Sequence, residues 1–132
     1  MDTFDIQDEL YLAFTNDDAL MEELGNPIGH EAKNLRFRRE ELMLSELTAE
    51  ILPFITFVFI DSIESKNMLR NRGILEVNIY CSSQYQAGII YRRLKDVLKQ
   101  LYDIQLIHEG QVSSGVSGIY CYRTRFKLLV NS

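Results

Sequence analysis

The sequence is poor in the residues that build disulfide frameworks and metal sites, with two cysteines and two histidines among 132 residues. Cys81 continues the apolar side of a predicted strand, whereas Cys121 alternates with arginines, so we expect two reduced thiols rather than a disulfide. His30 and His108 lack Cys, Asp or Glu partners at the spacing of metal ligands. The sequence therefore predicts no bound metal and no other cofactor.

Long apolar runs are also missing. The longest spans residues 51–60 and contains Pro53 and Thr56, and it falls short of the roughly 20 residues that a membrane helix requires. No signal-peptide pattern opens the chain. We expect a protein that contacts no membrane and that resides, or is assembled, in a cytosol.

Signatures of catalysis are absent from the sequence, which has no P-loop, GxGxxG, GxSxG or HExxH motif. His108 and Glu109 are neighbours in a predicted strand, where adjacent side chains point to opposite faces. Cys81 is expected in apolar surroundings, which raise the pKa of a thiol and make it a poor nucleophile. We expect the protein not to be an enzyme.

Positive charge is scarce overall, since 14 lysines and arginines face 19 acidic residues and the formal net charge is −5. This balance argues against extended nucleic-acid binding, which needs clustered basic side chains. One side of the last predicted strand nevertheless carries Arg123, Arg125 and Lys127. These residues form either the solvated side of an edge strand or a contact surface for an acidic partner or for passing DNA.

Residues 73–104 read as a strand followed directly by a helix. Every second residue is apolar over 74–81, which predicts a strand with one buried face. Ser83 and Gln86 have the spacing of a capping box, and apolar residues recur at helical spacing over 87–101. We expect this helix to fold back onto the sheet that contains the strand.

The remaining elements follow from similar patterns. Residues 3–25 form one kinked helix or two short ones, with Asn16–Asp18 as a second start signal. Residues 26–50 are an irregular arm or loop, in which 35–38 suit a short strand or an extended arm. Strands are expected at 52–60, 105–112 and 119–130, with a polar connection at 61–72 and a flexible loop at 110–118. The prediction is a single α+β domain over 1–132, in which two main helices pack on one face of a mainly antiparallel four-stranded sheet in the order α-β-β-α-β-β.

The strand at 52–60 is apolar on both faces, with Phe54 and Val58 on one side and Phe57 and Phe59 on the other. Two helices can cover one face of a four-stranded sheet. The other face then needs either the 35–47 segment or a neighbouring subunit, and a heterologous contact repeated around an axis closes a ring.

The pattern resembles the tail completion proteins of long-tailed bacteriophages and prophages, which include tail terminators and head-to-tail joining proteins. The resemblance rests on four stretches, and it covers most of the chain. They are the helix that ends in 17–25, the strand start at 52–57, the strand at 75–80 and the helix at 89–98.

This resemblance implies a structural virion protein. Copies, commonly six, would form a ring that closes the tail tube and joins it to a head connector or stopper protein, with DNA passing transiently through the lumen. The protein would occupy the host cytoplasm before assembly and the tail end or neck of the virion afterwards. The loops at 61–72 and 110–118 are expected to make assembly contacts. The residues expected at the assembly interface are Arg36, Arg38, Arg39, Phe57, Phe59, Arg70, Arg72, Arg123, Arg125 and Lys127.

The alternative function is a small cellular binding module that recognises RNA or a peptide on a sheet face. Tyr80, Tyr120 and Tyr122 would supply the stacking surfaces. Against this reading, tyrosines on strands are common in packed cores, and the net charge is unfavourable for RNA.

Overall fold

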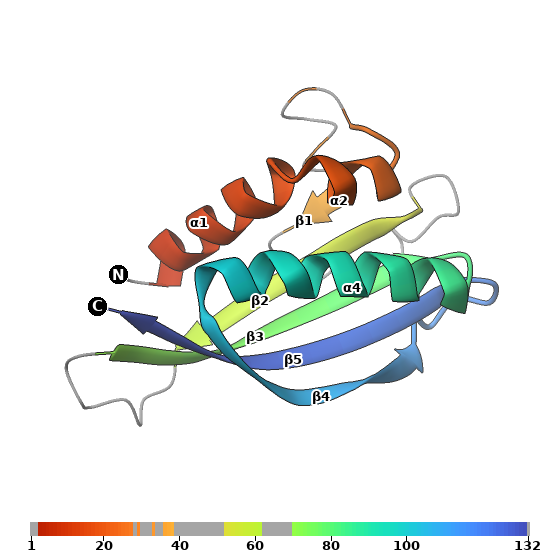
Figure 1. Ribbon diagram of the computed structural model, residues 1–132. Helices are drawn as coiled ribbons and strands as arrows, with labels where there is room; N and C mark the ends of the chain where they lie inside the picture. Colours follow the sequence, from red (N-terminus) through yellow and green to blue (C-terminus); the bar gives the residue numbers. More distant parts are fainter. Residues whose placement is uncertain are drawn as a thin grey trace.

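The computed structural model describes residues 3–27, 29, 33, 36–38, 52–61 and 70–131. Figure 1 shows an α+β arrangement in which helices cover one side of a twisted sheet. The elements, in chain order, are α1 (Thr3–Thr15), α2 (Asp18–Glu23), β1 (Phe37–Arg38), β2 (Phe54–Asp61), β3 (Arg70–Cys81), α4 (Gln84–Leu101), β4 (Asp103–Ser113) and β5 (Tyr120–Asn131).

The sheet has five strands in the order β1-β2-β3-β5-β4. The four longer strands pair antiparallel, as expected, but β1 pairs parallel to β2 and makes the sheet mixed. The predicted α+β class is confirmed, but the prediction of a mainly antiparallel four-stranded sheet with two main helices is matched only in part, since the described residues form a five-stranded mixed sheet and three helices. Strand β1, which the prediction lacks, has only two residues. Two residues are too few for alternation to distinguish a strand from an extended arm.

Two of the expected loops are shorter than predicted. Strand β3 begins at Arg70, so only 62–69 of the expected connection lie outside the strands, and they are outside the described residues. Strand β4 continues to Ser113, so part of the expected flexible loop at 110–118 belongs to the sheet. Of the predicted arm at 26–50, the structure describes residues 26, 27, 29, 33 and 36–38.

The N-terminal segment forms two helices rather than one kinked helix. Asp17 caps α2, because its carboxylate accepts a hydrogen bond from the Leu20 amide at 3.0 Å. Helix α4 begins as predicted, with the Ser83 hydroxyl accepting from the Gln86 amide at 3.2 Å. The return bond of the capping box differs, since Gln86 Oε1 accepts from the amide and hydroxyl of Ser82 rather than from the cap residue.

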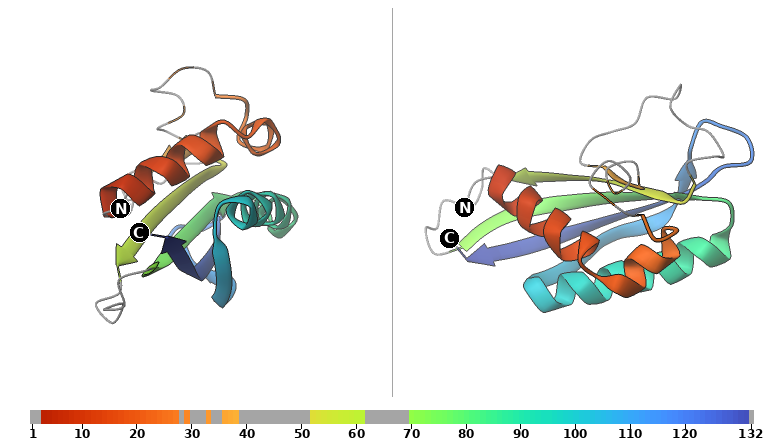
Figure 2. Two further views of the ribbon diagram at one scale, coloured as in Figure 1. Left: turned by 60° about the vertical axis from the view of Figure 1, so that its left-hand side comes forward. Right: turned by 90° about the horizontal axis from the view of Figure 1, so that it is seen from above.

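The core lies between the helices and the sheet (Figures 1 and 2). Its helix side consists of buried residues of α1, α2 and α4, and its sheet side comes from alternate residues of β2, β3 and β5. Phe37 of β1 joins it, with its ring centroid 5.0 Å from that of Phe14 and 4.8 Å from that of Phe57. Through Phe37, the two-residue strand thus fixes the start of β2 beneath α1.

The first half of β2 is buried on both faces within a single chain. Phe57 and Phe59 are 0% and 2% exposed in the core beneath the helices. On the opposite face Phe54 is 0% exposed and stacks on Tyr80 with ring centroids 4.7 Å apart, and Thr56 is 2% exposed. Phe54 and Thr56 therefore need no neighbouring subunit to cover them, and Phe57 and Phe59 are buried beneath the helices of their own chain.

Candidate functional site

The face of the sheet opposite the described helices, which we call the helix-free face, carries the basic residues of the last strand. Arg123 and Arg125 of β5 stand opposite Asn78 and Glu76 of β3 in the antiparallel register. Arg123 Nε donates to Asn78 Oδ1 at 2.8 Å, and Arg125 Nε donates to Glu76 Oε1 at 2.8 Å. Arg123 Nε also lies 3.6 Å from Glu76 Oε1, so two guanidinium groups share one carboxylate.

This arrangement leaves an excess of positive charge. The Arg125 and Arg123 side chains are 45% and 32% exposed, whereas that of Glu76 is 15% exposed. Lys127 follows on the same face, between Ile74 of β3 and Gln105 of β4. We call Arg123, Arg125 and Lys127 the basic face. Each guanidinium group carries five N–H donors, so the exposed donors of Arg123 and Arg125 can face an acidic partner while Glu76 stays paired.

The other expected interface arginines are placed differently. Arg36 Nη1 donates to the Pro53 carbonyl at 3.1 Å, and the Arg38 guanidinium lies 5.9 Å from the centroid of the Phe54 ring. Both side chains therefore pack at the start of β2. Arg39 and the side chains of Arg70 and Arg72 lie outside the described residues, although the backbone of the latter two pairs with β5.

The three tyrosines proposed as one binding platform lie on two faces of the sheet. Tyr80 pairs with Cys121 on the helix-free face, whereas Tyr120 and Tyr122 pair with Cys81 and Ile79 on the face that packs against the helices. Paired residues of neighbouring strands lie on the same face, and successive residues alternate between faces. The Tyr80 side chain therefore points away from those of Tyr120 and Tyr122. The RNA- or peptide-binding module built on all three is therefore not supported.

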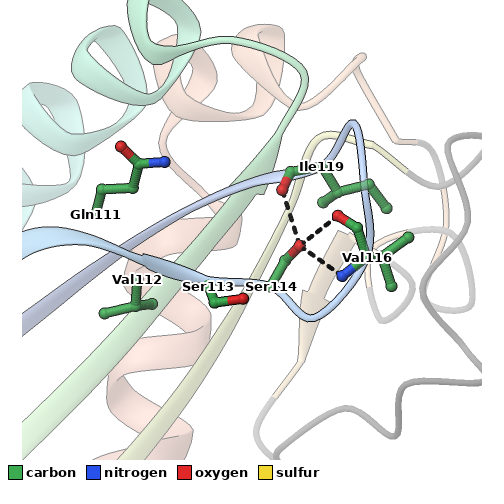
Figure 3. Close-up of a pocket in the computed structure, with 6 residues that line it drawn as sticks. All are labelled: Gln111, Val112, Ser113, Ser114, Val116 and Ile119. Atoms are coloured by element: carbon green, nitrogen blue, oxygen red, sulfur yellow. Dashed lines mark hydrogen bonds between the residues drawn. The ribbon is translucent and has the colours of Figure 1, made fainter.

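The hairpin between β4 and β5 is organised by one serine, Ser114, that the sequence analysis did not single out. Its hydroxyl contacts the carbonyls of Val116 and Ile119 at 2.9 and 2.8 Å and accepts from the Val116 amide at 3.2 Å (Figure 3). Residues around this turn line an open hollow of about 430 Å³. A serine can form an ST-turn with the amide two residues later, and this local pattern could have identified Ser114 from the sequence. A loop that we expected to be flexible is thus held in shape at the end of the sheet.

The two cysteines are free thiols. Cys81 faces the helices and Cys121 lies on the helix-free face, so the side chains point away from each other although their strands are neighbours. Burial raises the pKa of both, that of Cys121 to about 11. In the described part of the chain, no three His, Cys, Asp or Glu side chains gather as metal ligands. Among the helices of the described ranges, none is long and apolar enough to cross a membrane.

The fold matches a chain of a gene transfer agent virion. That solved structure, described as the virion of a native gene transfer agent particle, contains a chain that superposes with a TM-score of 0.61. The alignment covers 93% of this chain and 92% of the other, at 8% sequence identity. No protein-family model matches the sequence, and no curated protein matches it. At this identity the likeness shows a shared fold, and function has to be argued separately.

Proposed function

We propose that this chain is a structural protein of a phage-like virion. The observation that carries the proposal is the extent of the structural match, which spans nearly the full length of both chains. A match of that extent includes the helix layer, the mixed sheet and the hairpins, rather than one common supersecondary unit. The pattern shared with tail completion proteins points in the same direction.

The specific role we propose is closure of the tail tube end and its connection to a head connector or stopper protein. Copies of the chain would form a ring through which DNA passes without lasting contact. The protein would be present in the host cytoplasm before assembly and at the tail end or neck of the virion afterwards. As proposed partners, it would contact itself, the tail tube protein and the connector.

The charge distribution supports a contact between unlike surfaces of neighbouring copies. The basic face lies on the helix-free side of the sheet, while every charged residue between Thr3 and Pro27 is acidic. These acidic residues belong to α1, α2 and the turns beside them, on the opposite side of the sheet, and Glu22 is exposed there. Helix α4 on the same side carries Arg92, Arg93, Lys95 and Lys99, so the acidic surface is limited to α1 and α2. A basic face and an acidic helix pair on opposite sides of the sheet favour head-to-tail contacts, which close a ring when the rotation between copies permits it.

Sedimentation with purified tail tubes tests the role. We expect the protein to cosediment with the tubes, and electron microscopy to show extra density at one tube end. Reversal of the basic face with Arg125→Glu and Lys127→Glu should weaken association between copies at least tenfold. Mixing this variant with a chain that carries Glu22→Lys and Glu23→Lys should restore the association, because the two reversed surfaces again have opposite charge. Basic side chains at the C-terminal end of α2 are compatible with the helix dipole.

The matched control is Lys99→Glu, an exposed charge change in the last turn of α4, which belongs neither to the basic face nor to α2. It should leave association unchanged. A protein that stays monomeric with tail tubes and does not bind their ends would contradict the tail-closing role. Its absence from purified particles of its own source would contradict the virion role itself.

A further inference from the structure

A second surface feature lies under the N-terminal half of α4, on the side of the sheet opposite the basic face. There residues of α4, β4 and β5 line a solvent-open hollow of about 410 Å³. Its lining includes Tyr91 of α4, Tyr120 and Tyr122 of β5 and Glu109 of β4. The ring centroids of Tyr91 and Tyr122 are 5.4 Å apart. We call this hollow the tyrosine pocket.

Gly88 keeps the tyrosine pocket open from the helix side. It lies in the interior of α4, where glycine destabilises a helix relative to alanine. A Cβ atom built at Gly88 would meet no heavy atom within 4 Å, so packing does not require a glycine here. Because Gly88 lines the pocket, a side chain at this position would take up space that now stays free.

The polar groups of the pocket favour a cation. The Glu109 carboxylate supplies the negative charge, and it interacts with the hydroxyl groups of Tyr91 and Tyr122 that also line the pocket. Burial, together with Glu109, raises the pKa of Tyr91 and Tyr122, so both remain neutral phenols near neutral pH. Such a hydroxyl can accept a hydrogen bond from an ammonium or guanidinium group.

The aromatic rings favour the same charge. The faces of tyrosine rings attract ammonium and guanidinium groups. The Tyr91 ring already makes this contact once, since Lys95 Nζ lies 5.7 Å from its centroid. Lys95 itself does not line the pocket.

We propose that the tyrosine pocket binds a lysine or arginine side chain presented by a partner protein. A pocket this open holds a single cationic group weakly, which suits one anchoring side chain within a larger protein contact rather than a free small molecule. The guanidinium of Arg92, which is exposed and also lines the pocket, opposes the incoming charge. Glu109 and Arg92 therefore have opposite effects on the affinity.

Titration of the purified chain with blocked amino acids, followed by NMR of the tyrosine ring signals, tests this inference. N-acetyl-lysine methylamide and N-acetyl-arginine methylamide should cause saturable shifts of Tyr91, Tyr120 and Tyr122. The norleucine derivative, which has the lysine stem without its charge, should bind at least fivefold more weakly. Glu109→Gln should weaken lysine binding at least fivefold, and Arg92→Gln should strengthen it. The control Glu22→Gln, an exposed carboxylate on α2, should change nothing.

Variants of Gly88 separate loss of binding from loss of folding. Gly88→Ala should raise the melting temperature, because the helix gains propensity. Gly88→Leu should block the pocket, and far-UV circular dichroism should show that the protein is still folded.

Equal binding of the norleucine derivative, or tighter binding of an N-acetyl-glutamate probe, would overturn the proposal. Tighter lysine binding by Glu109→Gln, or weaker lysine binding by Arg92→Gln, would also overturn it. The assay uses the isolated chain, so its outcome does not depend on whether the protein belongs to a virion.

Discussion

Asp17 and Arg93 join the N-terminal helices to α4 through a bidentate ion pair. Arg93 Nε donates to Asp17 Oδ2 at 2.7 Å, and Arg93 Nη2 bonds to Asp17 Oδ1. Asp17 Oδ2 also caps α2 by accepting from the Leu20 amide. The Asp17 side chain is only 13% exposed. One carboxylate therefore sets the start of α2 and fixes α2 against α4.

Replacement of Asp17 should separate these two roles. Asp17→Asn keeps a good cap but loses the charge, and we expect a loss of about 1 kcal/mol in the free energy of unfolding. Asp17→Ala loses both, and we expect about 2 kcal/mol. Urea denaturation measures both values, and the exposed neighbour Asp18 supplies the control Asp18→Asn. No loss for Asn would show that the ion pair contributes nothing, and equal losses for Asn and Ala would show the same for the cap.

The same pair predicts the response of stability to acid. The hydrogen bond from Arg93 is the main cause that holds the pKa of Asp17 below its usual value. A carboxyl with a lowered folded-state pKa stabilises the protein above its unfolded pKa of about 4, and this contribution is lost as the pH falls through the folded value. The stability difference between wild type and Asp17→Asn should thus be constant near neutrality and shrink below about pH 4. A difference that persists at pH 2 would contradict this assignment.

Phe37 is the residue that holds β1 in the sheet. Its ring contacts those of Phe14, Phe57 and Tyr11, and it is 1% exposed. Truncation of a buried phenylalanine removes this contact area and leaves a cavity, so Phe37→Ala should cost about 3–5 kcal/mol. Leu12→Ala is the control, because Leu12 is 58% exposed. A loss below about 1 kcal/mol would mean that the segment around Phe37 does not pack on the core in solution.

Ser114 should determine how rigid the β4–β5 hairpin is. Ser114→Ala removes the acceptor of the Val116 amide and the donor shared by two carbonyls, at a cost of about 1 kcal/mol. Amide hydrogen exchange at Val116 should become faster, while exchange in the centre of β3 should not change. Ser117→Ala, an exposed serine of the same loop, is the matched control. Unchanged exchange at Val116 would show that other contacts hold the turn.

The sequence was most informative where one residue pattern had one structural solution. Alternation in 74–81 identified the buried face of β3, and the polarity of β5 placed Arg123, Arg125 and Lys127 on one side. The sequence was uninformative where tertiary contacts decide. Strand β1 exists because Phe37 finds a place between α1 and β2, which a two-residue pattern cannot show.

Register irregularities were also beyond the sequence. The pairing of β4 with β5 shifts between Leu106 and His108, so alternation in this strand changes face at a point that no local motif marks. Because of this shift, Glu109 shares the helix side of the sheet with Tyr122, whereas His108 lies on the other face, opposite Arg125. The tyrosine pocket could not be predicted for the same reason, since it combines β4 beyond the bulge with α4 and β5.

The two cysteines provide a probe of both faces of the sheet. Cys81 is 0% exposed on the helix side, and Cys121 is 1% exposed on the helix-free side. Reaction with a thiol reagent needs both access to the sulfur and a thiolate. Burial blocks access, and because it raises the pKa of both thiols it also lowers the thiolate fraction. At pH 8 neither thiol of the native protein should react with an aromatic disulfide reagent within minutes, whereas both should react in urea. A Ser117→Cys variant, with an exposed thiol on the hairpin, should react at once and serves as the positive control. Rapid labelling of Cys121 alone would show that the helix-free face opens in solution, and rapid labelling of Cys81 would show the same for the layer beneath α4.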